Sequence, residues 1–338
     1  MRLSPWLVAA LVLLAVLGAL VTYKASGSLA TIERVESTGQ LLPKAERIAT
    51  APLPVAMRPL ARAFNYLAIV WPALVFGVLI GATVRALVPS AWLAGLFGGP
   101  PWRSHVLGGL AGAPLMLCSC CAAPIFAAIH DRTRLAGPAS ALLLASPSLN
   151  PAALALTFLL FTPAVGWTRM AMATILVLAM SALAARLVPR TPGNAVDCAI
   201  ETETRVHPAS ALRAIGVEAT RLAVQTLPLI VLGVVASAVL VEIIPIARLS
   251  EGSFDTAIVL LVALVAVPIA LPTFAEIPLA LGLLAAGAPA GAAVALLVAG
   301  PAINLPSLLT LRRMTGTRYA MALGAGTFLV AAVGGLLV

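Results

Sequence analysis

Long, almost uncharged apolar stretches recur along this 338-residue chain, and they constrain its fold more than any other feature. A membrane-spanning helix needs about 20 mostly apolar residues. Hydrophobic residues make up 61% and charged residues 10% of the chain, whereas soluble domains carry about 25% charged residues. We therefore predict an all-α polytopic membrane protein. The apolar stretches are Pro5–Tyr23, Asn65–Val88, His105–Ile129, Gly137–Phe161, Trp167–Val188, Gln225–Ile244, Ile258–Ala285, Gly291–Leu311 and Tyr319–Val338.

The first apolar stretch, Pro5–Tyr23, is interpreted as a retained N-terminal anchor helix. A cleaved signal peptide is the alternative, but it would have an apolar core of about 7–15 residues followed by a small-residue cleavage site. The sequence VTYKASG offers no clean site of that kind. The predicted division is an anchor helix and polar loop over 1–62, a first repeat over 63–188, a polar linker over 189–212 and a second repeat over 213–338.

The two predicted repeats rest on a match of the chain with itself at a nearly constant offset. Alanine and leucine matches mean little in so apolar a chain, but matched glycine, proline and asparagine residues are hard to produce by chance. The sequence therefore predicts an internal duplication. The matched pairs include Pro72 and Pro228, Gly77 and Gly233, Pro114 and Pro268, Pro124 and Pro278, Pro147 and Pro301, and Asn150 and Asn304.

Matched prolines inside apolar stretches predict broken helices. Proline donates no backbone hydrogen bond and clashes with the preceding turn, and in lipid the freed backbone groups persist only where protein or a water-filled cavity covers them. Paired interruptions in two halves are typical of secondary transporters, which bind substrate between the halves. A simple kink in a packed helix is the alternative for any single proline. We predict breaks at Pro114, Pro124, Pro147, Pro268, Pro278 and Pro301.

The arginines indicate how the two halves are related. Arg132 and Arg134 follow the first broken stretch, whereas the corresponding loop of the second half is uncharged and its basic residues come one helix later. Because basic loops face the cytoplasm, this asymmetry favours inverted repeats. That topology requires His105–Ile129 and Ile258–Ala285 to be re-entrant. Arg169 is a further basic residue in the first half and makes the difference in loop charge between the halves less clear.

Three of the four cysteines fall in one run, Cys118-Ser119-Cys120-Cys121. Thiolates select soft ions such as Cu(I) and Zn(II), and trivalent arsenic is soft by the same reasoning. Side chains two residues apart do not face one way on a regular helix, but an unwound Cys-x-Cys could present both sulfurs to one ion. Cys118 and Cys120 are therefore the candidate metal ligands, and Cys121 and Ser119 are further substrate-binding candidates. Burial of small hydrophobic cysteines is the alternative, and Cys198 is assigned no role.

Glu276 and two asparagines complete the candidate site. Glu276 is the one charge within Ile258–Ala285, where an ionisable side chain costs about 2.5–3.5 kcal/mol or more and usually marks an ion path or a proton relay. Permanent protonation or a helix cap are the alternatives. Asn150 and Asn304 each follow a predicted break and can both donate and accept hydrogen bonds. Contact with substrate and satisfaction of broken backbone remain open for both.

Several function classes are excluded by what the chain lacks. The net charge of +9 comes from basic residues scattered at the ends of apolar stretches, which suits membrane orientation rather than nucleic-acid binding. No Gly-x-x-x-x-Gly-Lys-Ser/Thr, His-Glu-x-x-His or Gly-x-Ser-x-Gly motif is present. The sequence therefore predicts a transporter rather than an enzyme, with no cofactor. The expected partners are the lipid bilayer and a small-molecule or ion substrate, and a homo-oligomer is allowed.

These motifs together resemble the ArsP-type permeases. The resemblance rests on the proline-framed Cys-x-Cys of Cys118 and Cys120, on the turn Ala145–Pro151 and on its later echo Gly300–Pro306, and it covers roughly Asn65–Leu311. It implies efflux of trivalent organoarsenicals, or of copper or zinc in some relatives, with the family's cysteine pair on Cys118 and Cys120. Residues 1–62 are less typical and the resemblance says nothing about them.

The leading hypothesis is a multi-pass permease of the cell inner (cytoplasmic) membrane that exports a soft, thiol-reactive metal or metalloid species, with a trivalent arsenical favoured. Cys118 and Cys120 would bind the substrate, and Glu276 would compensate charge or couple export to protons. Asn150 and Asn304 would shape the two half-sites. A membrane thiol-redox protein and a permease for a sulfur-containing small molecule are the alternatives.

Overall fold

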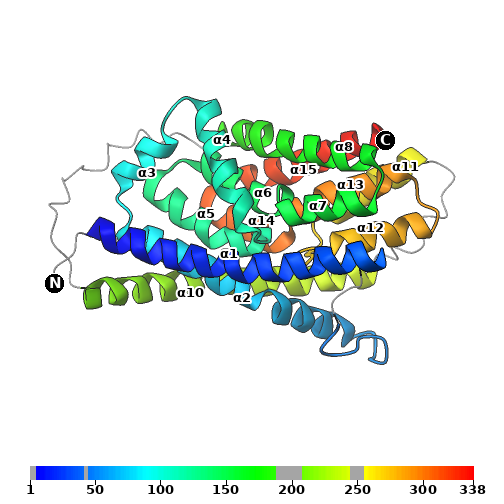
Figure 1. Cartoon of the computed structure of the whole chain (residues 1–338), viewed down its shortest axis with the longest axis horizontal. Helices are drawn as coiled ribbons and strands as arrows, with labels where there is room; N and C mark the ends of the chain where they lie inside the picture. Colours follow the sequence, from blue (N-terminus) through cyan, green and yellow to red (C-terminus); the bar gives the residue numbers. More distant parts are fainter. Residues whose placement is uncertain (1–4, 42–44, 188–207, 244–254) are drawn as a thin grey trace.

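The computed structural model describes residues 5–41, 45–187, 208–243 and 255–338. These residues form helices and contain no strand, which confirms the all-α prediction (Figure 1). Most of the predicted linker, including Cys198, lies outside the described residues. The α-helices are α1 (Pro5–Thr38), α2 (Arg58–Leu87), α3 (Ser90–Phe97), α4 (Pro101–Gly112), α5 (Ser119–Thr133), α6 (Ala136–Ser148), α7 (Pro151–Leu160), α8 (Pro163–Ile175), α9 (Ser181–Ala185), α10 (Pro208–Ile243), α11 (Asp255–Ala266), α12 (Glu276–Ala285), α13 (Ala290–Ala302), α14 (Leu305–Thr315) and α15 (Thr317–Leu336). A 3₁₀ turn, η1 (Ala113–Leu115), follows α4, and a π-helical turn, η2 (Leu176–Met180), follows α8.

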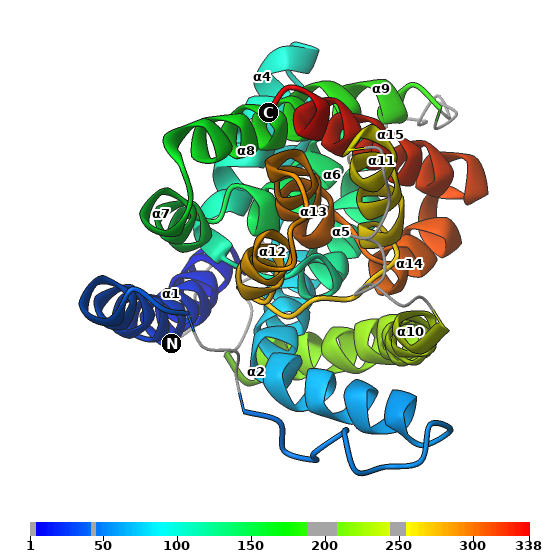
Figure 2. The same cartoon turned by 90° about the vertical axis from the view of Figure 1, so that its right-hand side faces the viewer.

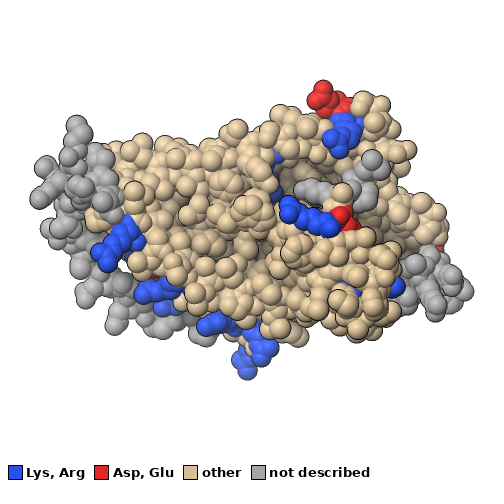
Figure 3. All heavy atoms as spheres, turned by 90° about the horizontal axis from the view of Figure 1, so that it is seen from below, with Lys and Arg blue, Asp and Glu red and all other residues tan. Residues whose placement is uncertain are grey.

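The described helices are long and apolar enough to make this a multi-pass membrane protein. By length and composition, 6 of them could cross a membrane, or up to 7 if the bent pair α13–α14 is one span. Large apolar side chains such as Trp71, Leu110 and Trp167 lie exposed, as expected where lipid rather than water is the solvent. Figure 3 shows that few charged side chains interrupt one long face of the molecule.

Helices α5, α6 and α13 lie at the centre of the bundle, as the view along its long axis shows (Figure 2). Every residue of α6 is buried, and α13 is buried from its second residue onward. Neither helix carries a charge, and a helix that is apolar all round belongs in the interior. Helices α2 and α10 pack together on one side, and α1 lies on the outside against α2 and α7.

Two broken helices occupy the stretches that were predicted to be re-entrant. The first consists of α4, η1 and α5 and is irregular at residues 116–118, and the second consists of α11 and α12 and is irregular at residues 267–275. Pro114 lies in η1 and Pro268 in the second irregular segment. A third interruption follows Pro301, where α13 and α14 meet at an angle of 47°. Pro147 is also close to a helix end, because it is the last residue but one of α6.

Pro124 and Pro278 do not mark breaks, which corrects the prediction for these two positions. Pro278 is the third residue of α12, where the backbone N–H would have no partner within the helix. Pro124 lies inside α5, which continues past it to Thr133 at the expense of the hydrogen bond to the Cys120 carbonyl. The first break therefore ends at Cys118, and Cys120 and Cys121 lie in the first turn of α5.

The two halves contact each other reciprocally. In the first half α4 and α5 both pack on α6, and in the second half α11 and α12 both pack on α13. Between the halves, α5 contacts α14 and α12 contacts α7. This order is the one that two repeats would produce, although the duplication and its inversion remain predictions.

Gly77 allows α2 to lie unusually close to α5. A Cβ atom at Gly77 would overlap the carbonyl oxygen of Cys121, and small residues are what allow membrane helices to approach. We expect Gly77→Val to destabilise the protein by about 1–3 kcal/mol, because the backbone of α5 must move away. Gly216→Val on α10 is the matched control, since no atom lies within 4 Å of the added Cβ. Equal thermal unfolding of the two variants in detergent would contradict this packing.

The N-terminal helix extends further than the sequence predicts. The expected anchor, Pro5–Tyr23, continues as helix to Thr38, so the first part of the expected polar loop is helical. Ser28 and Val35 in this extension are buried, with 5% and 3% of their surface exposed. The polar part of α1 therefore packs against the rest of the protein.

Candidate functional site

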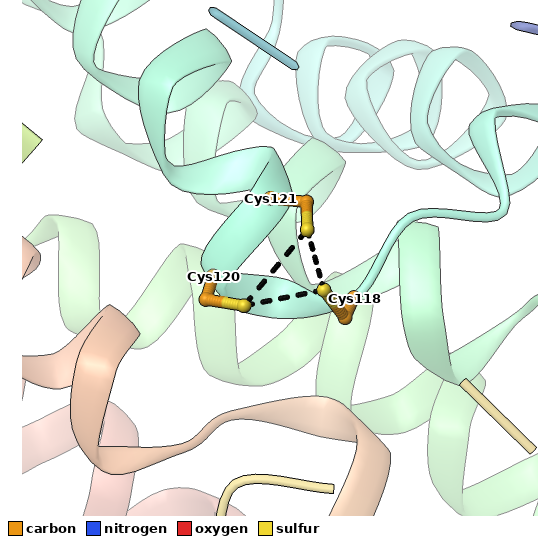
Figure 4. A group of neighbouring side chains, drawn as sticks. All are labelled: Cys118, Cys120 and Cys121. Carbon is orange, nitrogen blue, oxygen red and sulfur yellow. Dashed lines mark hydrogen bonds between the residues drawn. The ribbon is translucent and has the colours of Figure 1, made fainter. Parts of the chain in front are cut away.

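The three clustered cysteines lie at the first break, with their sulfurs facing one another (Figure 4). The Cys118 Sγ lies 2.7 Å from that of Cys121 and 3.2 Å from that of Cys120, and the Cys120 and Cys121 sulfurs are 3.9 Å apart. All three residues are buried, and all three are free thiols. Among the described residues this is the group whose ligand atoms, all within 4.8 Å of one another, could hold a metal ion.

The position of Cys118 at the start of α5 explains this convergence. Met116 is in the left-handed conformation, with φ 50°, and Cys118 is extended and occupies the N-cap position of the helix without a side-chain capping hydrogen bond. The side chain of an N-cap residue folds back toward the second and third residues of its helix, which here are Cys120 and Cys121. The predicted pair therefore becomes a group of three, in which Cys118 is the shared neighbour. The positive end of the α5 dipole also favours negative charge on these sulfurs.

Neighbouring polar groups fix this arrangement. The Tyr66 hydroxyl of α2 lies 3.1 Å from the Cys120 Sγ, and the backbone N–H of Leu117 donates to the Ser146 hydroxyl of α6 over 3.0 Å. Sequence reasoning missed Tyr66, although a phenol within an apolar span was a visible signal. The cysteines are thus held between α2 and α6.

A cavity of about 190 Å³ reaches the cysteines at Cys118. Its walls come from four separate parts of the chain: α1, α2, the first break at Cys118 and the irregular segment before α12. The lining residues are Tyr23, Lys24, Gly27, Ser28, Thr31, Ile69, Val70, Ala73, Cys118, Thr273 and Phe274.

Glu276 is buried beside this wall and has a partner that sequence reasoning missed. Its carboxylate accepts a hydrogen bond of 3.0 Å from the Arg169 guanidinium of α8, and the two side chains are 3% and 1% exposed. Arg169 also donates to the Thr157 hydroxyl of α7. Glu276 is therefore not an isolated charge, since Arg169 compensates it within the bundle. The pair joins the second half of the protein to the first.

The two asparagines begin the helices that follow their breaks. The Asn150 Oδ1 accepts from the backbone N–H groups of Ala152 and Ala153 at the start of α7, and Asn304 forms a capping box with Ser307 at the start of α14. These contacts satisfy broken backbone. Within the described part of the chain, seven buried side-chain polar atoms nevertheless have no hydrogen-bond partner, which is uncommon in proteins. Four of the seven are Ser119 Oγ, Ser148 Oγ, Asn150 Nδ2 and Arg169 Nε.

A second, larger cavity of about 590 Å³ adjoins the other end of α5 and is lined by charged side chains. Arg85 in its wall bridges Asp131 over 2.9 Å and Glu218 over 3.3 Å. Helix α5 thus extends from a buried thiol cluster to a charged cavity.

Comparison with known proteins identifies the family. A family model described as "Predicted permease", ArsP_1, matches residues 57–338. The chain belongs to this ArsP-type permease family. The permease is 31% identical over 283 residues to the UPF0718 protein YraQ of Escherichia coli strain K12, which covers 82% of this chain and 78% of that protein.

A second relative of the permease is the UPF0718 protein MJ0584 of Methanocaldococcus jannaschii, 34% identical over 91 residues that cover 27% of this chain and 25% of that protein. No solved structure matches. The resemblance noted in the sequence is thus confirmed, and a membrane permease with a small-molecule or ion substrate, rather than an enzyme, follows from it.

Proposed function

We propose that this permease exports a soft, thiol-reactive metal or metalloid species, with a trivalent arsenical favoured, across the cell inner membrane. The observation that supports this most directly is the cluster of Cys118, Cys120 and Cys121, whose sulfurs lie within 4.8 Å of one another at a helix break. Sulfur ligands select soft ions over hard ones such as Mg²⁺ and Ca²⁺. The cavity that Cys118 lines would give a small substrate access to the cluster at that residue.

Binding of an arsenical needs only ligand exchange. A species R–As(OH)₂ exchanges both hydroxyls for two cysteine sulfurs, the two thiol protons leave in two water molecules, and arsenic stays trivalent. The third thiol can displace one bound sulfur, which takes up the proton that the third thiol gives up. The arsenical can therefore move between sulfurs within the cluster without being oxidised or reduced.

The buried ion pair is the proposed coupling element of export. A proton on Glu276 would leave Arg169 buried and unpaired, which is costly, so proton uptake and a rearrangement of α8 against α12 would be linked. Asn150 and Ser119 have open polar atoms at the breaks, and we assign them secondary contacts with the substrate. Asn304, whose side chain is taken up by its capping box, shapes the second half-site.

A thiol-redox function is the alternative that the geometry favours next. Cys118 and Cys121 have the Cys-x-x-Cys spacing of redox pairs and lie at a helix N-terminus, with sulfurs 2.7 Å apart. In that case the two thiols would form a disulfide and pass two electrons and two protons to an oxidised thiol partner. A permease for a sulfur-containing small molecule would use the same cysteines to contact the sulfur of that molecule.

Uptake into everted membrane vesicles separates these functions. We expect the permease to accumulate phenylarsine oxide, with competition by Cu(I) or Zn(II) and none by thiosulfate. Vesicles carrying the triple variant Cys118→Ser, Cys120→Ser, Cys121→Ser are the control and should show only background uptake. Thiosulfate uptake would support the sulfur-compound alternative. Reversible oxidation of the thiols in cells, found by thiol trapping without movement of any of these species, would support the redox function.

A further inference from the structure

The N-terminal helix α1 supplies part of the cysteine cavity, although it lies outside the segment that the family model matches. That match begins at residue 57, whereas Tyr23, Lys24, Gly27, Ser28 and Thr31 line the cavity that reaches Cys118. Helix α1 therefore does more than anchor the chain. Because of α1, part of the cavity wall in this permease comes from residues outside the family match.

The inward face of α1 changes character at Lys24. Leu20, Ser28 and Val35 are 0%, 5% and 3% exposed, which marks the stripe of α1 that packs against the bundle. Lys24 and Thr31 fall on the same stripe, because residues three and four apart share a helix face. The stripe is apolar up to Leu20 and polar from Lys24 to Thr31, where it borders the cavity.

Lys24 is a lone charge in this cavity. No carboxylate is among the lining residues, and within the described residues Lys24 makes no ion pair and no hydrogen bond. An ionisable side chain within a membrane protein marks a functional site by default, and the charge of Lys24 also acts on Cys118 in the same cavity. The hydroxyls of Ser28 on α1 and Thr273 before α12 also line the cavity and can donate to an anion, whereas the Thr31 hydroxyl donates to the Gly27 carbonyl.

We propose that Lys24 selects thiophilic substrates that also carry an anionic oxygen group. The cysteines hold the soft atom, and the Lys24 ammonium with the neighbouring hydroxyls holds the anionic group. The inference rests on the proposed thiol-dependent transport and specifies its substrate class. The cavity volume of about 190 Å³ lies below the roughly 300–1,000 Å³ of sites for drug-sized ligands, so the substrate is a small molecule rather than a peptide conjugate.

Two matched probes test this selection. Phenylarsine oxide and 4-carboxyphenylarsine oxide share the soft atom and the ring and differ in one carboxylate. We expect wild-type vesicles to take up the carboxylated probe with the lower half-saturation concentration. Lys24→Met should weaken that preference by about tenfold or more, the usual effect of losing one charge-assisted hydrogen bond. Lys24→Arg should retain the preference.

The controls separate charge selection from other roles of the residue. Arg34 carries the same charge on the exposed face of α1, so Arg34→Met should leave the preference unchanged unless the general surface potential causes it. Membrane abundance of each variant shows that it folds, and protection of the cysteines from alkylation by each probe reports binding without transport.

Each outcome bears on the proposal. An unchanged ratio in Lys24→Met, or an equal loss for both probes, would overturn the selection by Lys24 while leaving thiol-dependent transport in place. An equal loss for both probes would indicate that Lys24 acts on the cysteine thiolates and not on the substrate. Binding of neither probe to the wild-type cysteines would overturn the proposed function, and this inference with it.

Discussion

Cys118→Ser is expected to lower the affinity of the permease for phenylarsine oxide by more than about 100-fold. Substitutions that only disturb the surroundings of a metal ligand cost about 10–100-fold, and this one removes the ligand itself. Cys118 belongs to both short sulfur pairs, at 2.7 and 3.2 Å, and its loss leaves the Cys120–Cys121 pair at 3.9 Å. A serine hydroxyl is a hard donor that does not replace a thiolate for a soft ion.

The single variants of the other two cysteines should have smaller effects. Cys121→Ser leaves the Cys118–Cys120 pair, and Cys120→Ser leaves the Cys118–Cys121 pair, so each retains two close sulfurs. The double variant Cys120→Ser, Cys121→Ser should be as defective as Cys118→Ser. Binding is measured by quantitative alkylation of the remaining thiols with and without the arsenical. Cys198→Ser is the matched control and should bind normally.

Three equal single-variant effects would contradict the role of Cys118 as the shared ligand. Normal binding by the double variant would contradict a thiolate site altogether. Membrane abundance must be compared in parallel, because the cysteines also pack against α2 and a loss of folding would imitate a loss of binding.

The cysteine site was largely predictable because its residues are adjacent in the sequence. A run of three cysteines beside a proline needs no knowledge of the fold to indicate a soft-ion site. The expected pair of Cys118 and Cys120 became a group of three because the break ends at Cys118 instead of extending to Pro124. An N-cap side chain reaches the third residue of its helix, and that position is Cys121.

Residues that act from a distance were not predictable in the same way. Arg169 only blurred the charge pattern of the loops, because its partner Glu276 lies 107 positions away. Lys24 resembled the first residue of a polar loop, since nothing in the sequence shows that α1 continues to Thr38 against a cavity. The phenol of Tyr66 was visible within an apolar span, but the sequence did not show that it contacts Cys120. Such contacts depend on how the helices pack, which apolar composition does not specify.

The buried ion pair leads to the second large expected effect. Arg169→Met should destabilise the permease by about 3–5 kcal/mol, because it leaves the Glu276 carboxylate buried and uncompensated. The measurements are membrane abundance and thermal unfolding in detergent. Arg221→Met is the matched control, because Arg221 is 56% exposed in its pair with Glu218 and exposed pairs contribute only about 0–1 kcal/mol.

The double variant Arg169→Met, Glu276→Met separates stability from coupling. Replacing both partners of a buried pair by apolar side chains is often neutral or stabilising, so abundance should return to near the wild-type value. If Glu276 couples export to protons, this folded variant should still bind phenylarsine oxide at the cysteines but should no longer accumulate it in response to a proton gradient. Gradient-driven accumulation by the double variant would contradict the coupling role. A double variant no more stable than Arg169→Met would contradict the ion pair as the source of the destabilisation, because removing Glu276 also removes the uncompensated charge.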